Sequence, residues 1–185
     1  MMKRMRIQVT VLLLAAIVAS ASPPLALAAS RQELERNAAQ ALQKLYEKNS
    51  AARLLGGKAK AVLVFPNIVK AGFMFGGQVG DGVLTTKGRT AGYYNSLAAS
   101  YGFQAGIQVF GYALFFMNDS ALSYLDKSDG WELGVGPSIV VVDAGVGKSL
   151  TSTTITQDVY AFIFDQKGLM AGLGIQGSKI TKLSM

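Results

Sequence analysis

The stretch SYGFQAGIQ, residues 100–108, alternates two kinds of residue in the manner of a β-strand. From Tyr101 to Ile107 the odd-numbered residues are apolar, whereas the even-numbered residues are alternately glycine and glutamine. Successive side chains of a strand point to opposite faces, so one face of this strand is apolar and the other combines glycine with amides. The glycine–glutamine face predicts a surface on which a partner packs close to the backbone, notably at Gly106, and hydrogen-bonds the amides.

The strand-like pattern continues through most of the chain after residue 60. Apolar runs are separated by glycine-containing turns, and the spacers leave little room for crossover helices. The sequence therefore predicts an α+β fold: a mainly antiparallel, glycine-rich β-sheet, closed as a barrel or stacked as a sandwich, with a helix packed on it. Strands are predicted at residues 61–65, ending at Pro66, at 72–79, ending in a turn at 80–82, around 93–94, in the run that ends at 117, and at 131–142, 158–164 and 169–176. Further turns are predicted at 87–89 and 166–168. A short helix is predicted at 121–125, capped by Asn118.

Glycines recur inside the predicted strands, for example Gly76, Gly80 and Gly106. A glycine in the interior of a strand weakens that strand, because it has no side chain to pack and loses more backbone entropy on folding. Their number requires a packing reason, such as strong curvature of the sheet or a closely laid element. We interpret these glycines as structural.

The segment before the sheet has the pattern of an amphipathic helix. Ser30 and Glu33 form a capping box, and an alanine- and leucine-rich stripe follows at helical spacing. A break is predicted near Asn49, and Gly56 and Gly57 end the helix. The stripe lacks Trp and Phe, which favours packing on the sheet of the same domain over insertion into a membrane.

Residues 1–28 have the composition of a secretory signal peptide. Lys3, Arg4 and Arg6 precede an apolar run at residues 7–18, and Ala26 and Ala28 provide a small-residue cleavage site. The run is short for a bilayer span, which argues against the alternative of an anchoring helix. We therefore expect residues 29–185 to form a single exported domain, periplasmic or secreted, with peripheral membrane association.

The charge of the chain is unevenly distributed. The net charge is +7, of which residues 1–28 contribute +3, so the expected mature chain has +4. Residues 29–89 are basic, whereas the remainder is slightly acidic. A basic half favours an anionic partner such as a membrane surface, and a merely solvated basic helix remains the alternative. Nucleic acid is not expected as a partner.

The residues needed for common catalytic and metal sites are missing. The chain has no histidine and no cysteine, which removes the usual nucleophile–base pairs and the usual zinc ligands. Two phosphate-binding patterns fail on their context: residues 143–149 lack the first glycine, and only eight residues follow the match at 172–177. Asp126 and Asp129 lack the spacing of a calcium loop. We therefore expect a binding protein, not an enzyme, without a metal or other cofactor.

Several blocks, in order along the chain, carry a resemblance to a known family. They are KAVLVFP (60–66), KAGFMFGGQVGDGVL (70–84), SYGFQAGIQ (100–108), ALFFMNDSAL (113–122), the turn at 145–148 and KGLMAGL (167–173). Together they resemble the SYLF domain family. The resemblance implies a lipid-binding domain without catalytic residues; eukaryotic members prefer phosphoinositides, and some bind actin filaments. An exported protein of bacterial type would meet neither in its own envelope, so generic anionic lipid or a host membrane is the expected ligand.

Basic residues are the predicted contacts for lipid headgroups. Four of them stand at positions that match the family: Lys58, Lys60, Lys70 and Lys148. Two more, Lys87 and Arg89, are proposed from the geometry of the predicted turn. The alternative function is protein interaction, including self-assembly or filament binding, through the glycine–glutamine face. A small enzyme of unrecognised type is the third alternative. Lipid binding requires clustered bases beside exposed apolar residues, assembly requires an uncovered strand edge, and catalysis requires a polar pocket.

Overall fold

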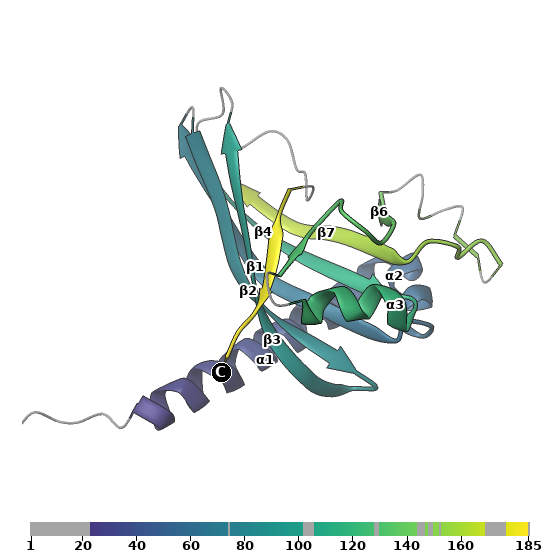
Figure 1. Cartoon of the computed structure of the whole chain (residues 1–185), viewed down its shortest axis with the longest axis horizontal. Helices are drawn as coiled ribbons and strands as arrows, with labels where there is room; N and C mark the ends of the chain where they lie inside the picture. The colour runs from purple at the N-terminus through teal and green to yellow at the C-terminus, as the bar shows by residue number, and fades with distance from the viewer. Residues whose placement is uncertain are drawn as a thin grey trace, which may run out of the picture.

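The structure is a computed structural model, and it describes residues 23–73, 75–101, 106–127, 130–143, 147, 150–151, 153–168 and 177–184. Eight strands form one sheet in the order β5-β8-β3-β2-β1-β4-β7-β6, and all neighbours are antiparallel except β6 and β7. The sheet curls into a half-barrel, with α1 packed against it (Figure 1), which confirms the predicted α+β class. The elements are α1 (Pro23–Lys48), α2 (Ser50–Gly56), β1 (Ala61–Phe73), β2 (Phe75–Thr86), β3 (Arg89–Tyr101), β4 (Gly106–Phe116), α3 (Asp119–Leu122), η1 (Ser123–Asp126), β5 (Trp131–Glu132), β6 (Ile139–Val141), β7 (Val159–Gly168) and β8 (Lys179–Lys182).

Local signals in the helical region are partly confirmed. The Asn49 side chain accepts a hydrogen bond from the backbone N–H of Ala52 at 3.0 Å and so caps α2, as the predicted break requires. The helix also ends at Gly56, as predicted. The capping box at Ser30 is wrong for this chain, because α1 begins at Pro23, where proline suits the first turn and the following alanines and leucines favour helix. Among the described residues, no helix is long and apolar enough to cross a membrane.

Each face of the sheet carries its own hydrophobic core. On the face covered by α1 and α2, called the outer face, Leu45 and Leu55 pack with Phe115 and Phe162. On the opposite, inner face, aromatic and aliphatic residues of the same strands pack against Trp131 and the short α3–η1 segment. The two cores lie at the end of the sheet where β1 begins, so the other end depends less on apolar packing.

The strands are longer than the sequence signals predict. β1 passes through Pro66, because the register shift against β4 between Phe65 and Ile68 leaves an irregularity in which a missing N–H is tolerated. β2 passes through residues 80–82, where a turn was predicted. β7 likewise continues through 166–168, whereas 131–142 forms only the short strands β5 and β6. The predicted strand at 169–176 lies outside the described residues. The turn at Lys87 and Gly88 and the cap at Asn118 are confirmed.

Gly80 shows why β2 stays extended through its glycines. A Cβ atom at this position would lie 2.6 Å from the backbone O of Asn67 and 3.1 Å from Cα of Ile68. The irregular part of β1 therefore presses against β2 where only a glycine fits. The packing reason predicted for strand glycines is confirmed at this position.

Replacing Gly80 by alanine is expected to lower the free energy of unfolding by about 1 to 3 kcal/mol, because β1 must shift to make room for the methyl group. Thermal melting measures the effect. Gly57→Ala is the control, since its Cβ would meet its nearest neighbour at 3.6 Å and its φ of −69° suits alanine. A Gly80→Ala protein that melts at or above the wild-type temperature would contradict the packing role.

Asp158 joins three elements next to the inner core. Its carboxylate accepts hydrogen bonds from the backbone N–H and the hydroxyl of Ser138, each at 2.9 Å, and from the Asn118 side chain at 2.7 Å. These donors, above all the Ser138 N–H, hold the pKa of Asp158 below its usual value. The carboxylate therefore stays ionised and fixes the loop before β7 to β6 and to the start of α3.

Candidate functional site: an exposed apolar face and a polar pocket

The end of the sheet opposite the two cores, where β1 ends and β2 begins, reverses the usual placement of polar and apolar residues. There β1 and β2 extend past the helices (Figure 1). Along β4, Ile107 points outward and is 64% exposed, whereas Gln108 points inward and is 4% exposed. Soluble sheets normally bury the apolar face of a strand, so the reversal needs an explanation.

Apolar side chains run across four neighbouring strands on the outer face. Leu97 of β3 pairs with Val79 of β2, Val79 with Val69 of β1, and Val69 with Val109 of β4. Leu97, Val79 and Val69 are 57%, 47% and 42% exposed. By strand alternation, Ile107 and Phe75, the latter 71% exposed, extend this row toward the strand ends. We call these six residues the apolar face.

A lysine stands at each side of the apolar face. Lys179 of β8 pairs with Leu97, and Lys167 of β7 pairs with Val109, so both lysines point to the outer face. Both are exposed. On the side toward α1, the face ends at Asp81, whose carboxylate accepts a hydrogen bond from Asn95 at 2.7 Å. The result is an apolar stripe with cations at both of its sides.

The inner side of the same strands is polar and buried. Gln78, Lys70 and Gln108 are register partners on β2, β1 and β4, and none is more than 8% exposed. Gln78 Nε2 donates to the Ser178 hydroxyl at 2.9 Å. At Gln108 the glycine–glutamine face predicted to be a contact surface is therefore turned inward; Gly102 and Gln104 lie outside the described residues. Gly106 is exposed with φ +141°, a backbone conformation that favours glycine, and the packed neighbour predicted for it stays a prediction.

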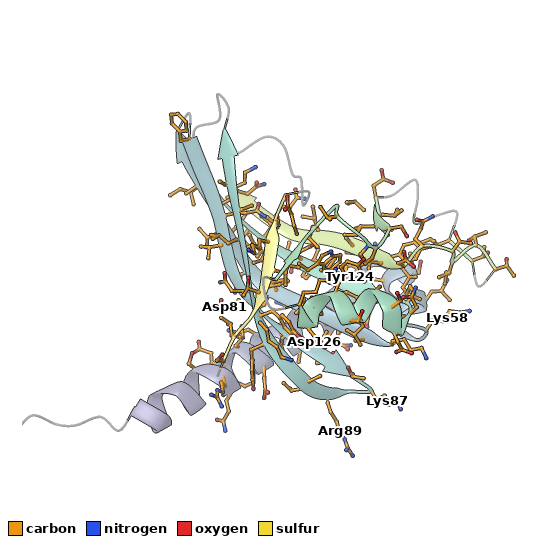
Figure 2. The ribbon with its side chains drawn as sticks, viewed as in Figure 1. Lys58, Asp81, Lys87, Arg89, Tyr124 and Asp126 are labelled. Atoms are coloured by element: carbon orange, nitrogen blue, oxygen red, sulfur yellow. The ribbon has the colours of Figure 1, made fainter. Side chains whose placement is uncertain are left out.

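The structure places four of the six predicted basic residues at one end of the sheet and Lys70 elsewhere. Lys58 and Lys60 precede β1, and Lys87 and Arg89 lie at the β2–β3 turn; the pairing of Val62 with Thr85 places both groups at the same end of the sheet (Figure 2). Lys60 forms an exposed ion pair with Asp119 at 3.8 Å. Lys70 lies ten residues further along β1, roughly 30 Å away at the rise of a strand, and is buried on the inner face. Lys148 lies outside the described residues. Headgroup contact by these residues stays a prediction.

A polar pocket adjoins the apolar face where α1 meets the sheet. It has a volume of about 210 Å³. Two strand irregularities form its floor: Pro66 and Asn67 interrupt the register of β1 with β4, and Asp165 is part of an irregularity in the register of β7 with β4. Asp165 adopts φ +50°, which is uncommon for a residue with a side chain. The pocket is lined by Asn37, Gln40, Ala41, Lys44, Pro66, Asn67, Val109, Phe110, Gly111, Asp165 and Lys167.

The charged groups of the pocket leave it positive. Asp165 is neutralised by an ion pair with Lys48 at 3.0 Å, which leaves Lys44 and Lys167 as uncompensated cations. In the described part of the chain, the side chains of Lys44, Lys167, Asn37 and Gln40 have no hydrogen-bond or ion-pair partner. Their donors are available to a ligand.

Sequence reasoning missed the residues of this site. Lys167 was assigned to a turn, and Lys44 and Lys179 received no role. The one sequence signal for this site was the alternation of residues in β4. It shows that the two faces of the strand differ, but it does not show which face other elements cover. Among the described residues, no three His, Cys, Asp or Glu side chains are grouped to hold a metal ion. Cations, amides and apolar side chains suit this site for binding.

Comparison with known proteins places part of the site in a family. A protein-family model described as "Ysc84: Las17-binding protein actin regulator" matches residues 97–184. No curated protein matches the chain. The matched segment contains Leu97, Val109, Lys167 and Lys179, whereas α1, β1 and β2 precede it. Residues 97–184 therefore belong to the Ysc84 (SYLF) domain family, and the predicted family is confirmed.

Proposed function

We propose that this domain is a non-catalytic, peripheral lipid-binding module that docks on anionic membranes through its apolar face. The observation that carries the proposal is the row of exposed apolar side chains across β3, β2, β1 and β4 with a lysine at each side. The family supports a lipid- or actin-related binding role. Its exported location, periplasmic or secreted, remains part of the proposal.

The physical chemistry of a bilayer surface matches this arrangement. Apolar side chains that enter the boundary between headgroups and acyl chains leave water, while flanking lysines remain among the headgroups. Each lysine near an anionic surface contributes about 1 kcal/mol, screened by salt. Two exposed lysines on the flanks of the apolar face cannot distinguish one anionic headgroup from another. We therefore expect this face to bind generic anionic lipid as well as it binds a phosphoinositide.

Flotation with vesicles tests the proposal. Wild-type protein is expected to float with phosphatidylcholine vesicles that contain phosphatidylglycerol, more weakly at high salt, and to remain unbound with phosphatidylcholine alone. Replacing Lys167 and Lys179 by glutamine should weaken binding about thirtyfold, since two contacts of about 1 kcal/mol are lost. Circular dichroism checks that the fold is kept.

The charge-matched control separates the two possible docking ends. Lys87 and Arg89 lie at the opposite end of the sheet, so their replacement by glutamine should leave flotation nearly unchanged. If this control loses vesicle binding while the Lys167 and Lys179 variant keeps it, the end of the sheet at the β2–β3 turn docks on the membrane and the apolar face does not. If wild-type protein ignores anionic vesicles at low salt but sediments with filaments or with itself, the protein-interaction alternative replaces lipid binding.

A further inference from the structure

The end of the β1–β2 hairpin carries no polar side chain on either face of the sheet. Residues 71–77 (AGFMFGG) contain no charged, hydroxyl or amide side chain. Phe75 in this segment is 71% exposed. The nearest polar side chains of the hairpin belong to Lys70 and Gln78, register partners that are buried on the inner face. A protein partner that packs on one face needs an apolar surface on that face alone, whereas an end that is apolar on both faces suits a medium that surrounds it.

The backbone of the hairpin end is paired with neighbouring strands almost to its tip. β1 pairs with β4 as far as Gly72 and Gly106. β2 pairs with β3 from Phe75 and Tyr101 onward. A backbone N–H or C=O group without a partner is costly in hydrocarbon, where no water can replace the missing hydrogen bond. Because β1 and β2 each have a strand neighbour on both sides, this hairpin can leave water with its ladder hydrogen bonds intact.

A row of register partners crosses the sheet at one level and ends in a lysine on each side: Lys179, Leu97, Val79, Val69, Val109 and Lys167. Phe75 lies four residues beyond Val79 along β2, which is about 13 Å at the rise of a strand. One leaflet of a bilayer contains about 15 Å of hydrocarbon, half of a core of about 30 Å. The hairpin end beyond the two lysines therefore fits within a single leaflet.

We propose that the end of the β1–β2 hairpin inserts end-on into the hydrocarbon of one leaflet, with Phe75 deep in it and with Lys167 and Lys179 at the level of the headgroups. The inference rests on the proposed docking and adds its orientation, in which the strands point into the membrane and the apolar face does not lie flat on it. In this orientation both faces of residues 71–77 meet acyl chains. Leu97, at the level of the lysines, stays close to the interface.

Quenching of tryptophan fluorescence by brominated lipids measures this orientation. The chain has a single tryptophan, Trp131, which is 1% exposed in the inner core and supplies a constant background. Phe75→Trp and Leu97→Trp are compared in phosphatidylcholine–phosphatidylglycerol vesicles with bromine at defined acyl-chain positions. The introduced side chain of Phe75→Trp is expected to lie deeper by about 13 Å, the rise of four residues. Val141→Trp is the control and should not be quenched, because Val141 is 43% exposed but lies outside the apolar face.

A second pair of variants measures the same orientation through affinity. Phe75→Gln should weaken vesicle binding about tenfold more than Leu97→Gln, because only the first variant carries an amide into hydrocarbon. Thermal melting checks that each variant keeps the fold. Equal depths of the two introduced tryptophans, or equal losses of affinity in the two glutamine variants, would overturn end-on insertion while docking through the apolar face stands. If wild-type protein does not float with the same vesicles, the docking proposal itself fails.

Discussion

Serine at Val79, Leu97 and Ile107 together is expected to lower the affinity for anionic vesicles about a hundredfold. These side chains are 47%, 57% and 64% exposed, so roughly half of each becomes buried when the face enters the bilayer interface. Full burial of such a side chain is favourable by about 1.5 to 3 kcal/mol, and half of it over three residues gives about 3 kcal/mol, which is about two decades in affinity. Vesicle titration of wild type and variant measures the ratio.

The same triple variant should unfold at nearly the wild-type denaturant concentration, since it removes exposed rather than packed groups. Serine at Val135 and Val141 is the control, because these residues are 60% and 43% exposed and lie outside the apolar face. Their replacement should leave binding unchanged. Equal loss of affinity in both variants would mean that exposed apolar area in general, not this face, drives binding.

The local features of the fold could be predicted from short sequence signals. Asn49 and Asn118 cap helices in the structure because their side chains bond the backbone three residues later, a pattern contained within a few positions. The turn at Lys87 and Gly88 and the alternation of β4 are local in the same sense. Such short-range sequence signals were enough to predict a mainly antiparallel sheet with a helix packed on it.

The extent of the strands could not be predicted, because it depends on neighbours far along the chain. Pro66 ends an isolated strand, but in β1 it occupies an irregularity between β2 and β4. Gly80 looks like a turn residue, yet the backbone of Asn67 demands a glycine there. In both cases the local structure depends on pairing between strands that are separate in the sequence, so the sequence of one segment cannot reveal it.

The candidate site was unpredictable for a related reason. Alternation in β2 and β4 distinguishes two faces, but the position of α1 decides where the outer face is covered and where it is exposed. The predicted Lys70 lies on the inner side, and the flanking Lys167 and Lys179 come from β7 and β8, remote in sequence from Val69 and Val79. Only the strand order places these residues together.

Alanine at Phe115 is expected to lower the free energy of unfolding by about 3 to 5 kcal/mol. The ring is fully buried on the outer face, with the Phe162 ring edge-on at 5.3 Å and the Tyr46 ring of α1 at 6.3 Å. Its removal leaves a cavity between β4 and α1, in addition to the lost burial of the ring. Urea unfolding measures the change, which is a large fraction of the stability of a typical domain, about 5 to 15 kcal/mol.

Alanine at Phe75 makes the matched comparison, because the same atoms are removed from a residue that is 71% exposed. Its stability should stay within about 0.5 kcal/mol of wild type, the usual range for surface substitutions, while its affinity for anionic vesicles falls. Phe115→Ala, under conditions where it remains folded, should bind vesicles as wild type does, since Phe115 lies beneath α1 and not on the apolar face. If Phe75→Ala were as destabilising as Phe115→Ala, the apolar face would be packed in the native protein, and no surface would remain there for a membrane to meet.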